Sequence, residues 1–347
     1  MTAAENPPDP AGRPGETDPR FALMDLAMSY LFPAALRAAA VLGVADHLTG
    51  GPRPVAELAE AVGADPLNLY RTLRLLATRG IFTEDDAGRF ALTPAAELLR
   101  ADVASSFRPA VLMLTDRTFW RPAGELATTV RTGASAFEEL FGMPFFDHFA
   151  RDADTAAVFH VGMAAMSDPE NPLIARACDL PPSPVVVDLG GGHGGLLLAV
   201  LRDHPDARGV LFDREHVLAG HRLGELGADH RWDLVAGDFF TEAPPGDVFL
   251  IKRILHDWDD EQCARILRHC RRAVSEGGRV LVVDAVVPPG NEPDPGKVID
   301  LLMMSSLTGR ERTRAEFEAL FAAADLQLTR VIPTGTRLSI VEGVPAQ

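Results

Sequence analysis

The feature that most constrains this chain is a cluster of five glycines within six positions, at 190–195. It follows an apolar run, Val185–Val187, that continues into Asp188 and Leu189. An apolar run that breaks into glycines is typical of a buried parallel strand that turns tightly into a helix. Glycine lets the backbone approach a ligand closely, and the first turn of the helix offers N–H groups that have no partner within the helix. The segment therefore predicts an α/β sheet with a ligand site at the end of this strand.

The nature of the ligand is ambiguous at this point. Gly190, Gly192 and Gly195 satisfy the G-x-G-x-x-G pattern of dinucleotide-binding folds. A second apolar run, 209–212, is followed by Asp213, whose carboxylate can accept hydrogen bonds from both hydroxyls of a ribose. These features fit a nicotinamide cofactor and an adenosyl cofactor equally well.

Three later segments distinguish the two cofactors. They are Gly237–Phe240 (GDFF), Lys252–Asp260 (KRILHDWDD) and Gly309–Thr313 (GRERT). Together with VDLGGGHG, this combination resembles the small-molecule O-methyltransferases that use S-adenosylmethionine. It is most similar to the two-domain group that includes plant phenylpropanoid enzymes and bacterial antibiotic-tailoring enzymes, and the resemblance runs from about Pro33 to Ser339. It implies a class I methyltransferase fold, a Rossmann-like doubly wound sheet, with an N-terminal, mostly helical, winged-helix dimerisation domain.

The order of apolar segments agrees with that α/β fold. From Pro181 onward, strand-like runs alternate with helical segments, as in a parallel sheet with helices on both faces. The expected strands are 185–189, 209–212, 234–236, 248–252, 279–285, 326–333 and 339–342. The expected domains are a disordered tail (1–20), a dimerisation domain (21–105) and a catalytic domain (106–347) whose first part, 106–170, forms linking helices.

The segment Phe21–Leu48 is unusually apolar, although Asp25 and Arg37 interrupt it. Its longest uncharged run, Leu26–Leu36, is too short to span a bilayer. Helices that are apolar on more than one face must be buried against something. By the resemblance, these helices build an interlocked homodimer.

The stretch 54–100 has the order helix, turn, helix and hairpin, which is a winged-helix pattern. Such a pattern also occurs in transcription regulators, so DNA binding is the rival hypothesis. Residues 51–100 carry seven acidic side chains against six arginines, which leaves no basic face for a phosphate backbone. A dimerisation scaffold is therefore favoured.

Charge and cysteine content restrict the cellular compartment and the classes of binding partner that are expected. A formal net charge of −16 repels nucleic acid and anionic membranes, so neither is expected as a partner. The three cysteines, Cys178, Cys263 and Cys270, have no paired spacing and fit a reducing cytoplasm. No secretory signal precedes the first apolar segment.

The catalytic residues follow from the chemistry and the resemblance together. Methyl transfer from a sulfonium is an in-line displacement, so the protein must align the reactants and remove the acceptor proton. The resemblance makes His256 the general base, and imidazole titrates near neutrality. Asp284 and Glu311 match the positions that flank this base, and which of them is its main partner stays open. Asp257 fits the N-cap of a helix that runs through Leu267.

The resemblance also implies the S-adenosylmethionine site. Asp188 faces the methionine end, because the cationic amino group there favours a carboxylate. Asp213 binds the ribose, and Asp238 accepts a hydrogen bond from the adenine amino group. The residues expected to bind the cofactor are Asp188, Gly190, Gly192, Asp213, Asp238, Phe239, Lys252, Met163 and Ser167.

Aromatic and methionine side chains suit a flat aromatic acceptor. Those expected to line its pocket are Trp120, Phe145, Phe146, Met303 and Met304. The acidic residues at 257 and 259–261 are nearly contiguous at a helix start and cannot all converge on one ion, so no metal is expected.

We therefore expect a cytoplasmic, homodimeric, metal-independent O-methyltransferase that acts on a hydroxyl of an aromatic small molecule. The composition, rich in Ala, Arg and Pro, suggests a high-GC genome and is compatible with antibiotic biosynthesis. The main alternative is a relative that binds S-adenosylmethionine but decarboxylates or hydroxylates a polyketide-like substrate. A nicotinamide oxidoreductase and a winged-helix regulator are further alternatives. The acceptor itself depends on pocket shape, which these motifs do not specify.

Overall fold

A computed structural model describes residues 18–151 and 153–346. The chain divides into two compact units, one that ends at Val111 and one that begins at Leu112. Most of the expected disordered tail, residues 1–17, lies outside the described residues. Its last residues are ordered, because Asp18 caps helix α1 (Pro19–Met28) by accepting a hydrogen bond from the Arg20 backbone.

The first unit has the winged-helix order that the sequence predicts. Helices α3 (Val55–Val62) and α4 (Pro66–Ala77) precede the hairpin of β2 (Phe82–Glu84) and β3 (Arg89–Leu92). Strand β3 also pairs with the short β1 (Arg53–Pro54), which gives a three-stranded antiparallel sheet of order β1-β3-β2. The remaining elements of this part of the chain are α2 (Leu31–Leu42), a 3-10 turn (Val44–Leu48), α5 (Pro94–Glu97) and α6 (Arg108–Leu114), which crosses the unit boundary.

Helix α4 shows how local sequence builds this unit. Asp65 accepts a hydrogen bond from the Asn68 backbone at 2.9 Å, and Pro66 begins the helix where its missing N–H costs nothing. The apolar residues that follow at helical spacing face inward, and the buried ones are Leu69, Leu73 and Leu76. Cap and apolar stripe therefore fix both the start and the orientation of the helix.

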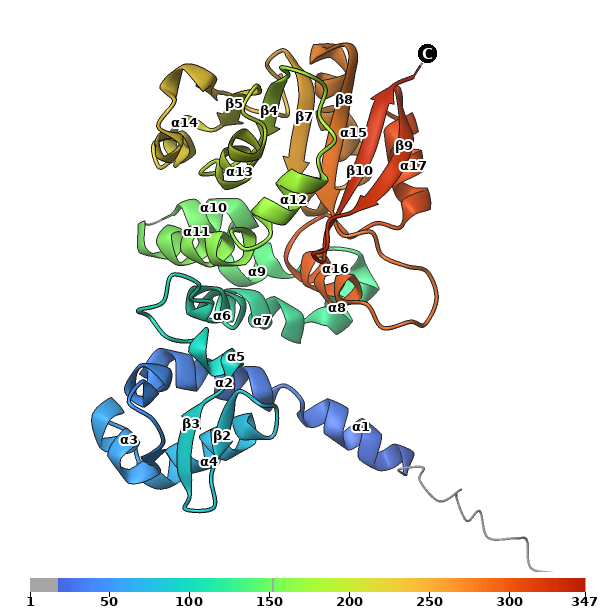
Figure 1. The fold of residues 1–347 in the computed structure, drawn as a ribbon. Coiled ribbons are helices and arrows are strands. Elements are labelled where there is room, and N and C mark those ends of the chain that lie inside the picture. The colour runs from blue at the N-terminus through green and yellow to red at the C-terminus, as the bar shows by residue number, and fades with distance from the viewer. Residues whose placement is uncertain (1–17, 152, 347) are drawn as a thin grey trace, which may run out of the picture. The chain divides into compact units, whose positions relative to one another are not determined.

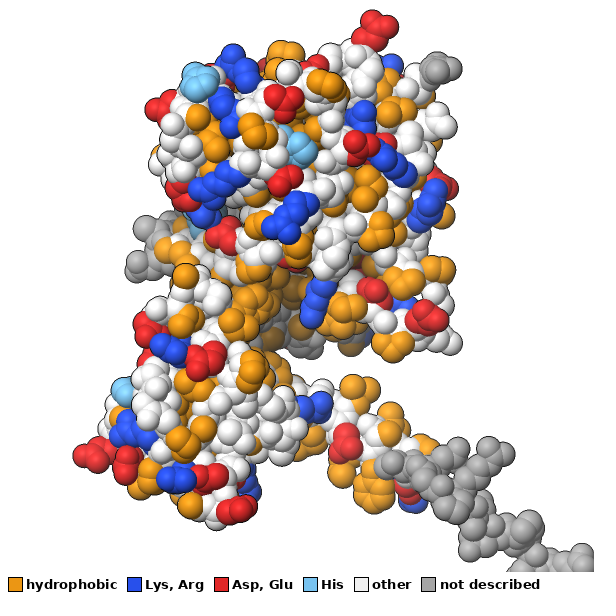
Figure 2. Space-filling view, viewed as in Figure 1, with side chains coloured by type: hydrophobic (Ala, Val, Ile, Leu, Met, Phe, Trp, Pro, Cys, Tyr) orange, Lys and Arg blue, Asp and Glu red, His pale blue; other side chains and the backbone are white. Residues whose placement is uncertain are grey.

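Helix α1 has no buried residue and leaves large apolar side chains exposed. Orange side chains gather over it in Figure 2, and Leu23 and Leu26 are 68% and 71% exposed. By length and composition alone, Pro19–Leu42 is apolar enough to cross a membrane. The structure breaks this stretch at a turn between α1 and α2, and exposed apolar surface of this extent is what a subunit interface covers.

The second unit holds a seven-stranded sheet of order β6-β5-β4-β7-β8-β10-β9 (Figure 1). The strands lie where the sequence predicts them: β4 (Val185–Leu189), β5 (Arg208–Asp213), β6 (Trp232–Ala236), β7 (Gly246–Lys252), β8 (Val274–Asp284), β9 (Leu326–Pro333) and β10 (Ser339–Pro345). The expectation of a wholly parallel sheet is wrong for β10, which is antiparallel to both of its neighbours. The reason is the short connection 334–338, which has no room for the helix that a parallel crossover needs.

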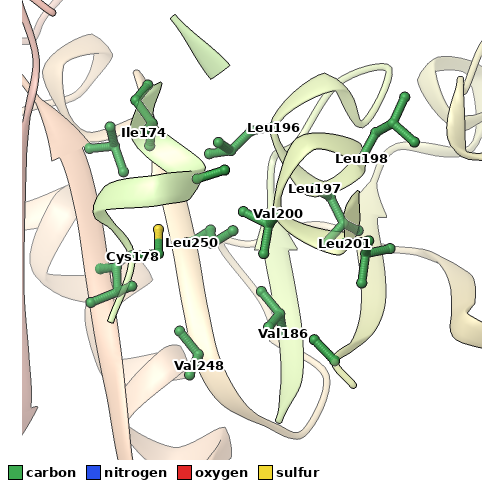
Figure 3. Close-up of a cluster of buried hydrophobic side chains, with 14 of the residues drawn as sticks. Ile174, Cys178, Val186, Leu196, Leu197, Leu198, Val200, Leu201, Val248 and Leu250 are labelled. Carbon is green, nitrogen blue, oxygen red and sulfur yellow. The ribbon is translucent and has the colours of Figure 1, made fainter. Parts of the chain in front are cut away.

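Helices cover both faces of this sheet. On one face, α12 (Asn171–Ala177) and α13 (Gly195–Asp203) pack on the strands through a cluster that includes Ile174, Leu197, Val200 and Leu250 (Figure 3). On the other face, α15 (Asp260–Ala273) and α17 (Arg314–Ala322) pack through Ile266, Phe317 and their neighbours. The sheet is therefore doubly wound, as the sequence predicts.

The other helices of the second unit lie before the first strand and between the later strands. Those before β4 are α7 (Arg117–Gly124), α8 (Leu126–Thr132), α9 (Phe137–Phe141), α10 (Phe145–Ala150) and α11 (Ala153–Ser167). The later ones are α14 (Glu215–Leu218), α16 (Pro295–Ser306) and three 3-10 turns at Leu223–Leu226, Asp229–Arg231 and Leu255–Asp257.

Parallel strands end at the same edge of a sheet, and this property positions the site. The glycine-rich loop follows β4, Asp213 ends β5, and Lys252 ends β7. Asp284 ends β8 at the same edge. The residues singled out in the sequence are thereby gathered from segments that are up to about a hundred positions apart.

Candidate active site

A cavity of about 1190 Å³ opens at this edge within the second unit. One part of its wall comes from the glycine-rich loop and the ends of β5, β6 and β7. The other part comes from α9, α10 and α11, from the segment after β7 and from the end of α16. We call these the cofactor end and the acceptor end.

The glycine-rich loop needs glycine for two separate reasons. Gly190 and Gly192 have φ of +68° and +60°, in the left-handed region that side chains disfavour. Gly191 is needed for space, because a Cβ there would collide with the carboxylate of Asp188. The loop backbone therefore leaves room in front of Asp188.

Asp188 is the strongest sign of a ligand at the cofactor end. It lines the cavity, its residue is 1% exposed, and its Oδ2 has no hydrogen-bond partner among the described residues. Burial raises the pKa of this carboxyl to about 7. A cationic group placed here would restore the ionised form and satisfy the open oxygen.

Asp213 and Asp238 lie beyond it along the cavity. Asp213 accepts hydrogen bonds from the Gly192 backbone at 2.9 Å and the Arg214 backbone at 2.7 Å, which fixes its carboxylate in place. Asp238 accepts from the Phe240 backbone at 2.9 Å and lies 3.2 Å from the Arg214 guanidinium. Phe239 lines the same part of the cavity. Two carboxylates that accept hydrogen bonds and an aromatic face fit the hydroxyls of a ribose and the amino group and ring of an adenine.

Lys252, Met163 and Ser167 also lie on the cavity wall. The Lys252 ammonium donates to Asn171 Oδ1 at 2.7 Å and to the Ser167 carbonyl at 3.5 Å. Burial lowers its pKa to about 8, despite the nearby Glu170. Asn171 was not predicted from the sequence, because it lies 81 positions from Lys252 in a segment with no motif.

His256 is held by Glu311 at the acceptor end. Its Nδ1 lies 2.8 Å from Glu311 Oε1, which resolves the partner left open in the sequence. Asp284 instead accepts a hydrogen bond from the Arg253 backbone at 3.0 Å. Because Nδ1–H donates to the carboxylate, neutral His256 presents the lone pair of Nε2.

Three carboxylates set the charge state of this histidine. Burial lowers its pKa, but Asp257, Glu311 and Asp284 outweigh burial and raise the pKa to about 9. Burial and the neighbouring Glu311 in turn raise the pKa of Asp284 to about 7, against the pull of His256. One oxygen each of Asp284 and Glu311 lacks a partner within residues 18–151 and 153–346. A pKa of about 9 keeps His256 protonated at neutral pH in the unliganded chain.

The interpretation of Asp257 as a helix cap is wrong. Helix α15 begins at Asp260, and its N-cap is Asp259, which accepts from the Gln262 backbone at 2.8 Å. Asp257 instead lines the cavity and places Oδ1 3.4 Å from His256 Nε2. His256 itself is 7% exposed and is not a lining residue, so Asp257 is the polar group of the pair that faces the cavity.

Arg253 is a second residue that the sequence analysis did not single out. It lines the cavity in a left-handed conformation, with φ of +54°. Its guanidinium donates to Glu170 at 2.9 Å and 3.1 Å, and its backbone N–H reaches Asp284. Only the three-dimensional fold brings these partners together, so no local sequence signal marks them.

Aromatic rings form much of the acceptor end. Phe146 stacks on Trp258 with ring centroids 5.5 Å apart, and Phe145 meets Phe146 edge-on at 5.3 Å. Both phenylalanines and Met304 line the cavity, together with Phe137 and Phe159. Flat apolar walls of this kind suit a planar ligand.

Two expected pocket residues lie elsewhere. Trp120 is 53% exposed and is absent from the cavity wall, because its position on α7 points it to the surface of this unit. Met303 is buried in the core between α16 and its neighbours, while the adjacent Met304 faces the cavity. Among the described residues, no three His, Cys, Asp or Glu side chains are placed to hold a metal ion.

Comparison with family models covers most of the chain. Residues 24–102 match an O-methyltransferase dimerisation domain, and residues 123–327 match an O-methyltransferase domain. The chain is 42% identical over 326 residues to the phenazine O-methyltransferase PhzM of Lysobacter antibioticus, which covers 93% of this chain and 95% of that protein.

Solved structures of methyltransferases are also similar to this chain. CalO1, a methyltransferase in calicheamicin biosynthesis solved with S-adenosylhomocysteine, is 48% identical with a TM-score of 0.89, over 95% of this chain and all of that one (100%). NcsB1, an O-methyltransferase from neocarzinostatin biosynthesis, was solved with S-adenosylmethionine and 2-hydroxy-5-methyl naphthoic acid. It is 36% identical with a TM-score of 0.78, and covers 96% of this chain and 100% of its own.

Proposed function

This chain belongs to the S-adenosylmethionine-dependent O-methyltransferases, and from that premise we propose that it methylates a hydroxyl group of a flat aromatic small molecule. The observation that carries the proposal is the composition of one cavity. It combines an open, buried carboxylate behind a glycine-rich loop with an aromatic chamber, and the His256–Glu311 pair lies directly behind Asp257 in its wall.

The residues of the cofactor end bind and orient S-adenosylmethionine, which supplies an electrophilic methyl group. Asp188 receives the cationic amino group, and Asp213 receives the ribose hydroxyls. Asp238 and Phe239 receive the adenine. Lys252, with Ser167 and Met163, closes the wall next to the methionine end.

His256 is the general base that takes the acceptor proton. Glu311 holds the ring through Nδ1, so the proton arrives at Nε2 and the resulting imidazolium is stabilised by the neighbouring carboxylates. Because Asp257 faces the cavity beside Nε2, its carboxylate stabilises the imidazolium that forms there and limits where the acceptor hydroxyl can lie when it donates its one proton to Nε2. The stacked Phe146 and Trp258 wall holds the ring plane.

The biological setting follows from the relatives. We infer a role in bacterial secondary metabolism, of the antibiotic-tailoring type, with a soluble enzyme in the cytoplasm. The three relatives described above are all named as methyltransferases, so decarboxylation and hydroxylation are not proposed. Through its dimerisation domain the chain forms a homodimer, and light scattering should give twice the mass of one chain.

The experiment that tests the assignment compares two ligands by thermal unfolding. S-adenosylhomocysteine should raise the melting temperature, and above its Kd the shift should grow with the logarithm of its concentration, because it binds the folded state only. NAD should have no effect. A shift with NAD and none with S-adenosylhomocysteine would overturn the proposal.

A further inference from the structure

Arg312 lies in the segment that supplies Glu311, but its side chain turns away from the cavity. The residue is 1% exposed and is the largest fully buried side chain among those described. Its guanidinium donates to the carbonyl of Leu255 at 2.8 Å and to the carbonyl of Trp258 at 3.0 Å. These two carbonyls flank the pair His256–Asp257 on either side.

Within residues 18–151 and 153–346, Asp260 is the acidic residue that forms an ion pair with this buried charge. Asp260, whose side chain is 54% exposed, accepts from Nε and Nη2 of Arg312 at 3.0 Å and 2.7 Å. The guanidinium thus links the start of α15 to both ends of the catalytic segment 255–258. Only a planar group with several donors in a fixed fork can make all of these bonds at once.

Two neighbours of Arg312 contact the same segment. Gly309 packs so tightly that a Cβ there would collide with the backbone of His256, Asp257 and Trp258. Glu311 holds the His256 ring through Nδ1. The stretch Gly309–Arg312 therefore fixes the backbone of the catalytic segment and the orientation of its imidazole together.

Stability alone does not account for a charge at this place. Burying a guanidinium has a large desolvation cost, and apolar side chains of similar volume often replace such groups without loss of stability. We propose that Arg312 is a positioning residue for methyl transfer: it fixes the backbone on both sides of His256–Asp257 and so sets the place of the base and of the acceptor hydroxyl. This inference rests on the base role of His256 proposed above.

The primary variant is Arg312→Lys, which keeps the positive charge but lacks the planar guanidinium with its several donors. A displacement of the base by about 1 Å is expected to lower kcat on an un-ionised naphthol by roughly 10²-fold. The loss should be several-fold smaller on a nitrophenol that is largely ionised at the assay pH, since that acceptor needs no base. The Kd for S-adenosylhomocysteine should stay within about twofold, because the cofactor end is untouched.

A second readout does not depend on any acceptor. The imidazole of His256, followed by NMR on histidine-labelled protein and assigned with His256→Gln, should titrate closer to its ordinary pKa in Arg312→Lys. The reason is that the raised pKa requires Asp257 and Glu311 at their present distances. An unchanged His256 titration in a folded Arg312→Lys protein would contradict the proposal.

Surface variants cover the case in which Arg312→Lys does not fold. Asp260→Asn weakens the same set of bonds from the exposed side and should lower kcat about 3- to 10-fold with the same dependence on acceptor acidity. The matched control is Arg314→Gln, which removes an exposed ion pair with Glu318 on α17 and should leave kcat unchanged.

The outcomes separate this inference from the proposed function. If His256→Gln loses turnover on naphthol and both Arg312→Lys and Asp260→Asn keep it, only the positioning role fails. Equal losses on both acceptors, or a parallel loss of S-adenosylhomocysteine affinity, would show a general scaffold role and also overturn the inference. If His256→Gln keeps turnover, the base role fails first.

Discussion

The two ends of the cavity are built in different ways. The cofactor end depends on backbone, since Gly190, Gly191 and Gly192 shape the loop and the carboxylates follow strand ends. The acceptor end depends on side chains from α9–α11 and α16 that come together only in the folded chain. The comparison teaches that a fixed ligand can be recognised by local geometry, while acceptor choice rests on packed side chains that can change without altering the fold.

The largest effect should come from replacing His256, the general base. His256→Gln keeps the shape of the side chain and removes the base, so kcat on an un-ionised phenol should fall by roughly 10²–10⁴-fold. Calorimetry should show S-adenosylhomocysteine binding unchanged, because Asp188, Asp213 and Asp238 are intact. A joint loss of turnover and cofactor affinity would mean that the two ends are not separable.

Asp188→Asn tests the cofactor end and separates stability from binding. Losing a charge-assisted contact should weaken S-adenosylhomocysteine binding roughly 10- to 100-fold. The pKa of Asp188 is raised from 3.8 to about 7, so its stabilising contribution is present at acidic pH and is lost as the pH rises through 7. At pH 8 the free energy of unfolding of the unliganded variant should therefore exceed that of the parent chain by about 1–3 kcal/mol. Its melting temperature should accordingly be higher. A lower melting temperature would contradict the account of this carboxyl.

The pH dependence of turnover reports on the base directly. His256 must be neutral to accept a proton, so kcat/KM for an un-ionised phenol should fall about tenfold per pH unit below its pKa. That pKa is about 9 in the unliganded chain, where carboxylates surround the ring. With saturating S-adenosylmethionine the cationic sulfonium should lower it, so the apparent pKa should lie below 9. A rate that is flat between pH 6 and 9 would contradict the base role.

Phe146→Ala is expected to have a smaller effect, confined to the acceptor end. Losing the ring that stacks on Trp258 should raise the acceptor KM by roughly tenfold, while cofactor affinity stays the same. Trp120→Ala is the matched control, since this exposed ring does not line the cavity. It should change the KM by less than about twofold in the same assay. Equal changes in KM for the two variants would contradict the assignment of Phe146 to the acceptor pocket and of Trp120 to the surface.

The same contrast explains what the sequence could predict. The strands, the glycine-rich loop and the carboxylates at strand ends are local patterns, and the structure brings Asp188, Asp213, Asp238 and Lys252 to one cavity as expected. The antiparallel β10 was missed, because its apolar pattern does not encode direction and only the short loop before it does.

The acceptor end was harder to predict for a physical reason. Side chains such as Met303 and Met304 are adjacent and chemically alike, yet helix rotation buries one in the core and turns the other to the cavity. Asp257 was mistaken for a cap because an aspartate before a helix usually is one, and Asp259 filled that role two positions later. Asn171 lies in a segment without a motif. Arg253 lies inside the segment 252–260, but its partners Glu170 and Asp284 are distant in sequence, so only the fold shows its contacts.

Transfer of the methyl group to a hydroxyl oxygen can be followed with a labelled cofactor. The chain is incubated with S-adenosylmethionine that carries a deuterated methyl group and with a panel of phenols, naphthoates and quinols, and the products are read by mass spectrometry. The labelled methyl should appear intact on a hydroxyl oxygen of at least one flat aromatic acceptor, with S-adenosylhomocysteine formed in equal amount. Cofactor binding without transfer to oxygen in any member of the panel, or release of carbon dioxide in its place, would contradict the proposed function.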